Sequence, residues 1–308
     1  FNIGDSLSTR AYLNPTKEAV YDVVAQRRLS FSELNSRANQ ACSGLQSLGI
    51  NKGDRVALLA YNGHEFVESF FGPAKAGIVL MPLNWRLTPV ELAFILKDGG
   101  ARAIVFHADF APVVEQIRAM GSQGSDIEQW ICIGEPTPEF AVDYETLLAE
   151  QSDDEPLEGA GGDDNLFIMY TSGTTGRSKG AMLTHTNILM NMEQTMELIP
   201  NLEKGKEVAL TALPLYHIFA FTVNFLGFYS IGARNILIPN PRPLSNLKRA
   251  FENYKITWMS GVNTLFNGLN GEIWFQDTPP KHLKFASAGG MALQGVVAER
   301  WEAVTGKT

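Results

Sequence analysis

The chain reads Tyr170-Thr171-Ser172-Gly173-Thr174-Thr175-Gly176-Arg177-Ser178-Lys179-Gly180 directly after the apolar run Leu166-Phe167-Ile168-Met169. Glycine lets backbone N–H groups approach an anion closely, and the hydroxyl side chains add further hydrogen-bond donors. Lys179 supplies a point charge that suits phosphate. A flexible linker is the alternative for a stretch rich in Gly, Ser and Thr. The preceding strand pattern and the embedded lysine favour a phosphate-binding loop.

This loop differs from the common phosphate loop of nucleoside triphosphatases, because it lacks the spacing G-x-x-x-x-G-K-[ST]. Only Gly306-Lys307-Thr308 matches the end of that motif, and Trp301 stands where its first glycine is required. The stretch at 170–180 is therefore the better candidate for a nucleotide site.

Short apolar segments alternate with helical patterns on both sides of the loop. The segments with a strand pattern are 55–60, 78–82, 103–106, 129–133, 166–170, 208–212, 235–239 and 258–262, and those with a helical pattern are 32–48, 64–76, 89–97 and 187–198. Apolar strands that alternate with helices predict mostly parallel sheets with both faces covered. We therefore expect an α/β protein with two stacked, mostly parallel sheets and flanking helices.

The composition changes between residues 151 and 165. This stretch carries six acidic residues and three glycines among its fifteen residues, which is typical of an exposed linker. We expect it to separate a first α/β subdomain at 1–160 from a second subdomain at 161–308, which contains the loop.

The charge and the cysteines exclude some classes of function. The chain has 308 residues and a formal net charge of −8, which argues against a nucleic-acid-binding protein, since such proteins need a basic surface. Cys42 and Cys132 lie in apolar segments without zinc-ligand spacing. We expect both to pack in the core of a protein from a reducing compartment.

Residues 208–233 contain no Lys, Arg, Asp or Glu. A run of this length can span a bilayer, but Pro214, His217, Asn224 and Ser230 interrupt its apolar character. A buried helix that lines an apolar ligand pocket is the better interpretation. The chain opens on Phe1 without a signal sequence, and we expect further residues upstream.

Residues 171–180 resemble the signature phosphate loop of the adenylate-forming superfamily, which includes acyl-CoA synthetases, luciferases and peptide-synthetase adenylation domains. Further motifs agree with that superfamily in order and spacing: Leu29-Ser30-Phe31-Ser32-Glu33-Leu34, Ala74-Lys75-Ala76-Gly77 with Pro82-Leu83-Asn84, Leu213-Pro214-Leu215-Tyr216-His217, and Ser287-Ala288-Gly289-Gly290-Met291. Residues 211–220, 261–267 and 294–306 look most like bacterial long-chain fatty acyl-CoA synthetases. The resemblance covers nearly the whole chain.

The resemblance implies the N-terminal part of a long-chain fatty acid–CoA ligase, which is an AMP-forming acid–thiol ligase. The implied substrates are a fatty acid, ATP and coenzyme A, and the implied cofactor is Mg²⁺. The residues that the resemblance assigns to ATP are Thr171, Ser172, Gly173, Thr174, Thr175, Gly176, Lys179, Gly289 and Gly290, with Thr171 also beside the metal. Lys179 and His217 are the implied catalytic residues. Lys179 stabilises phosphoryl charge, and His217 positions the fatty acid carboxylate, which is already ionised and needs no general base.

The uncharged run after His217 is the candidate wall of an acyl tunnel. We expect Phe221, Val262 and Leu265 together to bind the acyl chain, although each residue taken alone is more typical of an ordinary core. His185 follows the strand of the loop, and we expect it to pack or to cap the helix at Asn187.

Several motifs of the family would follow Thr308: a glutamate that helps to hold Mg²⁺, a ribose-binding aspartate, and a C-terminal domain with a catalytic lysine. We therefore expect these residues to be an incomplete part of the enzyme, inactive alone. We also expect a cytoplasmic protein. A homodimer and peripheral contact with the inner membrane are both compatible with the sequence.

Three alternatives remain. A non-catalytic nucleotide- or acyl-binding module would lack the same late motifs, and a synthetase for medium-chain or aryl acids would share the motifs that are present. A peptide-synthetase adenylation domain is less favoured, because Tyr216-His217 replaces the segment whose aspartate pairs with the ammonium of an amino acid.

Overall fold

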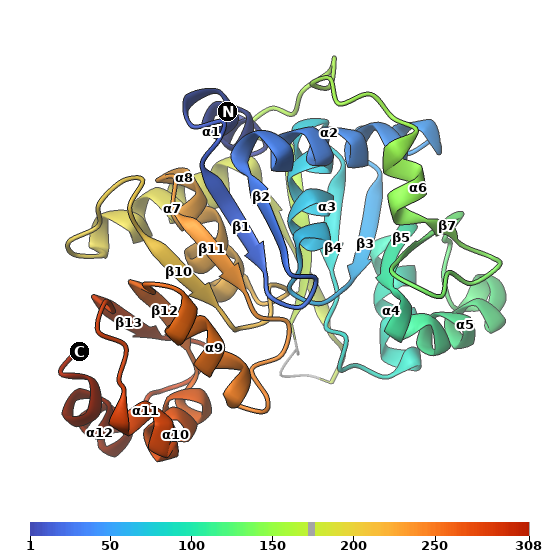
Figure 1. The fold of residues 1–308 in the computed structure, drawn as a ribbon. Coiled ribbons are helices and arrows are strands. Elements are labelled where there is room, and N and C mark those ends of the chain that lie inside the picture. Colours follow the sequence, from blue (N-terminus) through green and yellow to red (C-terminus); the bar gives the residue numbers. More distant parts are fainter. Residues whose placement is uncertain (172–175, 308) are drawn as a thin grey trace. The chain divides into compact units, whose positions relative to one another are not determined.

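The computed structural model describes residues 1–171 and 176–307, and its helices and strands form two compact units (Figure 1). The first unit comprises Phe1–Pro15, Ser32–Tyr61 and Glu65–Met190. The second comprises Thr16–Phe31, Asn62–His64 and the chain from Asn191 onward. These bounds differ from a division near residue 160, because β8 (Asn165–Thr171) pairs with β4 (Val79–Pro82) and so continues the sheet of the first unit.

The first unit is built on a seven-stranded sheet with the order β7-β6-β5-β3-β4-β8-β9. Its other strands are β3 (Arg55–Leu59), β5 (Ala101–His107), β6 (Gln129–Ile133), β7 (Val142–Asp143) and β9 (Lys179–Thr184). Among the described strands of this sheet, β8 and β9 pair antiparallel and the other neighbours pair parallel. The helices are α1 (Asp5–Leu13), α2 (Phe31–Ser47), α3 (His64–Lys75), α4 (Pro89–Gly99), α5 (Ala111–Ala119) and α6 (Tyr144–Ala149), with the short 3-10 turns η1 (Ala108–Phe110) and η2 (Gly121–Gln123). Helix α7 (His185–Leu198) begins in the first unit and continues into the second.

The second unit contains a six-stranded sheet with the order β13-β12-β10-β11-β1-β2. Its strands are β1 (Glu18–Asp22), β2 (Arg27–Ser30), β10 (Val208–Thr211), β11 (Arg234–Leu237), β12 (Trp258–Gly261) and β13 (Phe285–Ala288). The hairpin of β1 and β2 is antiparallel, and the other strand pairs are parallel. The helical segments are η3 (Ala220–Gly227), α8 (Phe228–Ser230), α9 (Ser245–Asn253), α10 (Asn263–Gly271), α11 (Ile273–Asp277) and α12 (Gly295–Thr305).

Both sheets are mostly parallel and flanked by helices, which confirms the predicted fold class. The burial of the central strands explains their apolar sequences. In β4 all four residues are buried, and in β3 every residue after Arg55 is buried. Strands that are covered on both faces need apolar side chains on both faces, so they show no alternation of polar and apolar residues.

Helix α4 begins and ends at clear sequence signals. The Thr88 hydroxyl accepts a hydrogen bond from the Glu91 N–H at 3.3 Å, and the Glu91 carboxylate accepts one from the Thr88 N–H at 2.8 Å. Pro89 occupies the first turn, and Gly100 ends the helix with a left-handed φ of +65°. This capping box and glycine stop fix both ends of the helix, which matters because α4 contacts the candidate phosphate hairpin.

The acidic stretch at 151–164 is mostly exposed, yet it is held against the first unit. The Glu155 carboxylate lies 2.8 Å from the ammonium of Lys75, whose side chain is 2% exposed. That ammonium also donates to the side-chain oxygens of Asn35 and Asn39, at 2.6 and 2.7 Å. A buried ammonium needs such partners, so the stretch is an anchored segment as well as a linker.

Cys42 and Cys132 are both buried and free, which confirms that they pack in the core. Burial raises the pKa of the Cys42 thiol to about 12 and that of the Cys132 thiol to about 11. Both thiols therefore stay protonated and unreactive at neutral pH.

The uncharged run at 208–233 folds as β10, a turn, η3 and α8, so it is not one continuous helix. Every residue of η3 is buried, and the segment lies inside the second unit as a packed helix. Over residues 1–171 and 176–307, none of the helices has both the length and the apolar character needed to cross a membrane.

Candidate functional site

The candidate phosphate loop connects two paired strands of the first unit. β8 and β9 are antiparallel, and Thr171 at the end of β8 lies directly opposite Lys179 at the start of β9. Side chains of directly opposite residues project from the same face of a sheet, with Cβ atoms about 5 Å apart. The hairpin thus brings a hydroxyl and an ammonium together. Ser172, Gly173, Thr174 and Thr175, which were assigned to ATP, lie outside the described residues.

Helix α4 anchors this hairpin on both sides of the loop. The Tyr170 hydroxyl donates to Asp98 Oδ2 at 2.6 Å. Burial, then the hydrogen bond to the Asp98 carboxylate, raises the pKa of Tyr170 above its ordinary value. On the far side of the loop, the Arg177 guanidinium lies 5.7 Å from the centre of the Phe94 ring, a cation–π distance. Asp98 and Phe94 could not be identified from sequence, because their spacing from the loop gives no local signal.

Two glycines of the hairpin are required for different reasons. Gly176 has a left-handed φ of +95°, which side chains with a Cβ rarely adopt. Gly180 is required by packing, since a Cβ there would lie 2.8 Å from Ile168 Cγ2 and 2.9 Å from the Tyr170 ring. The strand can therefore pass closely over Tyr170.

Thr171, Gly176 and Lys179 are all exposed. An exposed hydroxyl, an accessible backbone and an ammonium at one sheet edge can bind an anion with several charges. Hydroxyl and phosphate oxygens are ligands that Mg²⁺ accepts, and it commonly keeps bound water as well. Thr171 therefore fits a place beside a metal bound to a nucleotide, as one ligand among phosphate oxygens and water.

The candidate residues of the second unit all follow the carboxyl ends of neighbouring parallel strands. β12 pairs with β10 on one side and β13 on the other (Figure 1). The turn at 213–217 follows β10, Val262 follows β12, and Gly289 and Gly290 follow β13. The Gly289 N–H donates to the Gly261 carbonyl at 3.1 Å. Ligands of open α/β sheets bind at this edge, so the positions agree with a binding site.

Glycine is required at positions 289 and 290 for two different reasons. A Cβ on Gly289 would lie 2.6 Å from the nearest carbons of the Phe219 ring. Gly290 has a φ of +78°, and its nearest neighbour is Val262 Cγ1, 4.0 Å from the position of a Cβ. The turn after β13 therefore packs against the segment after β10, and a side chain at Gly290 would reach the segment after β12 only at 4.0 Å.

His217 is exposed at the point where the turn after β10 becomes a helix. Its N–H donates to the Pro214 carbonyl at 3.1 Å, and its carbonyl accepts from the Phe221 N–H at 3.0 Å. Its ring lies 4.8 Å from the Tyr216 ring, at an interplanar angle of 45°. The imidazole can therefore reach a ligand at the sheet edge while its backbone is held by the turn.

The three residues expected to bind the acyl chain differ in their burial. Phe221 is fully buried in η3, and its ring lies 5.5 Å from the centre of the Phe225 ring at an interplanar angle of 48°. Leu265 is 5% exposed and belongs to the core of the second unit, and Val262 packs against that core while partly exposed. Val262 is therefore the most accessible of the three.

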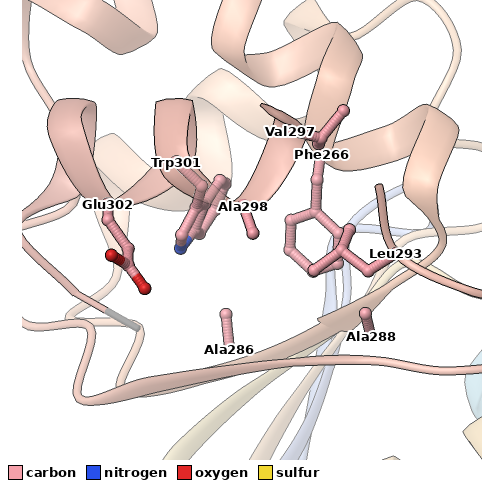
Figure 2. Close-up of a pocket in the computed structure, with 8 residues that line it drawn as sticks. All are labelled: Phe266, Ala286, Ala288, Leu293, Val297, Ala298, Trp301 and Glu302. Carbon is pink, nitrogen blue, oxygen red and sulfur yellow. The ribbon is translucent and has the colours of Figure 1, made fainter. Parts of the chain in front are cut away.

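An apolar pocket of about 50 Å³ lies between the strand β13 and two helices of the second unit (Figure 2). Ala286 and Ala288 project toward it from the strand, and the rings of Phe266 and Trp301 come from the opposite side. Its lining residues are Phe266, Ala286, Ala288, Leu293, Val297, Ala298, Trp301 and Glu302. This pocket was not predicted from the sequence. The small residues of β13 and the pair Val297 and Trp301, four residues apart on α12, were the available signals.

His185 has a packing role, as expected. Its side chain is completely buried, and its Nδ1 accepts a hydrogen bond from the Ile3 N–H at 3.0 Å. Burial lowers the pKa of His185 to about 4. The cap of α7 is supplied instead by Thr184, whose hydroxyl accepts from the Asn187 N–H at 3.1 Å.

Curated CoA ligases are similar to this chain in sequence. Over 303 residues the chain is 38% identical to a long-chain-fatty-acid–CoA ligase of Salmonella typhimurium, covering 91% of this chain and 54% of the relative. It is 38% identical over 221 residues to the long-chain-fatty-acid–CoA ligase FadD13 of Mycobacterium tuberculosis, covering 72% of this chain and 42% of FadD13. The chain thus spans about half the length of the curated relatives it matches.

Solved structures share the fold. The N-terminal domain of FACL13 from Mycobacterium tuberculosis, solved with an inhibitor, superposes with a TM-score of 0.89 at 31% identity, over 98% of this chain and 73% of that one. The anthranilate CoA ligase AuaEII, solved in complex with anthranoyl-AMP, superposes with a TM-score of 0.92 at 26% identity, over 100% of this chain and 58% of AuaEII. The family model described as AMP-binding enzyme matches residues 7–308. Because this match covers nearly its whole length, the chain belongs to the family of AMP-binding enzymes.

Proposed function

We propose that the protein containing this chain activates a long-chain fatty acid with ATP and transfers it to coenzyme A. In the first step a carboxylate oxygen attacks the α-phosphorus of ATP. The bond from that phosphorus to the oxygen bridging to the β-phosphate breaks, and pyrophosphate leaves. In the second step the thiolate of coenzyme A attacks the acyl carbonyl, and AMP leaves. The identity of 38% to named long-chain-fatty-acid–CoA ligases over 91% of the chain supports this proposal most strongly.

The phosphate hairpin acts by electrostatics in this proposal. Phosphoryl transfer needs stabilisation of charge on phosphate oxygens more than a covalent nucleophile. The Lys179 ammonium, the Thr171 hydroxyl and the backbone at Gly176 are exposed at the hairpin and can supply it. Ser172, Gly173, Thr174 and Thr175 are proposed to add hydroxyl and N–H donors. Mg²⁺, when bound, would supply further positive charge to the phosphates.

The second unit binds the acid in this proposal. His217 positions the carboxylate, and Gly289 and Gly290 let the backbone after β13 approach the nucleotide. Phe221, Val262 and Leu265 contact the acyl chain. The exposure of His217 and the glycine-requiring turn at the same sheet edge support these roles.

A panel of carboxylic acids tests the proposal. Pyrophosphate release by the full-length protein is measured with ATP, Mg²⁺ and, in turn, hexanoate, decanoate, palmitate and benzoate. The proposal expects release with palmitate. Release with hexanoate or decanoate alone would indicate a medium-chain synthetase, and release with benzoate alone an aryl acid synthetase, an activity class represented by the anthranilate ligase. ATP binding without release for any acid would indicate a non-catalytic binding module.

We further propose a cytoplasmic location. The two free, buried cysteines are compatible with a reducing compartment. Peripheral contact with the inner membrane would bring the enzyme to a substrate that dissolves in lipid. Fractionation of cells into soluble and membrane fractions, with and without palmitate, tests both statements.

A further inference from the structure

The turn at 213–217 needs an explanation of its own, because it is irregular, largely buried and carries His217. Leu213 is 8% exposed and Leu215 is completely buried. Backbone N–H and C=O groups in such a segment cannot rely on water, so they need partners within the protein.

Asn62 supplies those partners. Its amide nitrogen donates to the Leu213 carbonyl at 2.8 Å, and its amide oxygen accepts from the Leu215 N–H at 2.9 Å. The side chain therefore pairs with the turn as a neighbouring strand would. All of these residues belong to the second unit.

The same amide also joins two strand ends. Its nitrogen donates to the Ile238 carbonyl at 3.2 Å, just after β11, while the Ile238 N–H donates to the Thr211 carbonyl at the end of β10. Two donors and one acceptor on one short side chain are a combination that only asparagine offers at this length.

Asn62 is itself held in place. It is 4% exposed. His64 follows Asn62 by two residues and is bound to Asp22. The backbone N–H and the Nδ1 of His64 lie 3.1 and 3.2 Å from Asp22 Oδ2. The Asp22 carboxylate also accepts from the N–H groups of Val24 and Ala25. The short segment Asn62–His64 is thus fixed at both ends, which a residue needs if it is to orient another.

We infer that Asn62 is a positioning residue for the acid-binding turn. It holds the backbone of Leu213 and Leu215 and thereby fixes the position of His217 at the sheet edge. The inference rests on the proposed function for its kinetic consequence. Misplacing a substrate-positioning group by about 1 Å can cost about a hundredfold in rate, so a displaced turn should affect the acid far more than ATP.

The variant Asn62→Asp tests this inference, because it keeps the shape and the acceptor but replaces the donors with a charged oxygen opposite two carbonyls. In the full-length protein the KM for palmitate should rise at least about tenfold, because small displacements of a substrate-positioning group have large effects. The KM for ATP should change by no more than about twofold. The matched control is Asn270→Asp. Asn270 lies on helix α10, is completely buried, and donates to the Val297 carbonyl on α12 at 3.0 Å. This control should lose stability without a selective effect on palmitate. A parallel rise in both KM values, or the same profile in both variants, would overturn the inference.

Hydrogen exchange at the Leu215 amide gives a second readout that does not require activity. In Asn62→Ala this amide loses its acceptor and should exchange at least about tenfold faster, since a lost protecting bond opens the site locally. Asn62→Asp, which keeps the acceptor, should protect it better than alanine does. If the wild-type protein activates no acid, the proposed function is wrong, and this exchange still decides whether Asn62 holds the turn. Unchanged exchange in Asn62→Ala would contradict the inference.

Discussion

The ring of Phe219 occupies the space that a Cβ on Gly289 would need, with its nearest carbons 2.6 Å from that position. The two residues are 70 positions apart in the sequence and meet because β10 and β13 are both neighbours of β12 in one parallel sheet. The contact joins the segment that carries His217 to the glycine turn proposed to meet the nucleotide.

This contact predicts that Gly289→Ala displaces the Phe219 ring and impairs acyl-adenylate formation. Overpacking of this kind typically costs about 1–3 kcal/mol of stability. Combining it with Phe219→Leu should recover part of the loss, because the smaller side chain frees the space. Urea unfolding midpoints and pyrophosphate release measure the two effects. Gly295→Ala is the control, since no atom lies within 4 Å of a Cβ there; equal losses in both alanine variants would refute the role of the contact.

Val262→Trp should shift the preferred acid toward shorter acyl chains. Val262 is partly exposed at the sheet edge, so an indole there can fill ligand space without first disrupting the core. Phe221→Trp is a less clean test, because Phe221 is completely buried and a larger ring would strain η3. The measurement is the rate profile over hexanoate, decanoate and palmitate, with Val24→Trp at a 72% exposed position as control. A profile identical to the wild type would place the acyl chain elsewhere.

His185 should make the protein sensitive to mild acid. Burial lowers the pKa of His185 from its ordinary 6.5 to about 4, so between these values the unfolded chain binds a proton that the folded protein does not. Its contribution to stability is complete above pH 6.5 and is lost as the pH falls toward 4. The loss amounts to about 3 kcal/mol. His185→Asn, which keeps an acceptor near Ile3 but does not titrate, should show a correspondingly flatter dependence of unfolding free energy on pH. Parallel curves for both proteins would contradict this prediction.

Glu155→Ala should loosen the anchored acidic stretch. The buried Lys75 ammonium would lose the carboxylate that it hydrogen-bonds and keep the side-chain oxygens of Asn35 and Asn39 as acceptors. Loss of one charge-assisted contact should cost about 1.5–3 kcal/mol. Denaturant unfolding measures this cost, and proteolysis within residues 151–164 should become faster. Glu158→Ala, at an exposed position of the same stretch, is the control. If both variants unfold alike, Lys75 does not depend on Glu155.

Local sequence patterns predicted the central strands well and the distant pairings poorly. β3, β4 and β5 were recognisable because strands buried on both faces are continuous apolar runs. The hairpin of β1 and β2 was not predicted. It joins the sheet of the second unit by pairing with β11, more than 200 residues away, and no local periodicity reports such a contact.

The candidate site shows the same limit. The loop at 170–180 was recognisable from its glycines, hydroxyl residues and lysine. Anion-binding loops use the backbone and side chains of consecutive residues, so their pattern is local in the sequence. β9 was overlooked because Lys179 and Gly180 read as part of that loop, although they pair with Thr171 and Tyr170. Asn62 and Asp98 make their contacts with the candidate site only in the folded protein, so their residue types gave no signal. Phe219 lies in the uncharged run expected to line the acyl tunnel, but its contact with Gly289 could not be predicted.

The most direct test of the central claim is palmitate-dependent pyrophosphate release by the full-length protein, compared between the wild type and Lys179→Ala. Lys179 lies opposite Thr171 at the base of the hairpin, and its exposed ammonium is proposed to bind the phosphates of ATP. Loss of this charge-assisted contact should cost about 1.5–3 kcal/mol, or about tenfold to a hundredfold in kcat/KM. Lys248→Ala, on helix α9, should leave release unchanged. The predicted result is that the wild type releases pyrophosphate with palmitate and that kcat/KM falls by this factor in Lys179→Ala. Equal release by the two proteins would contradict the account.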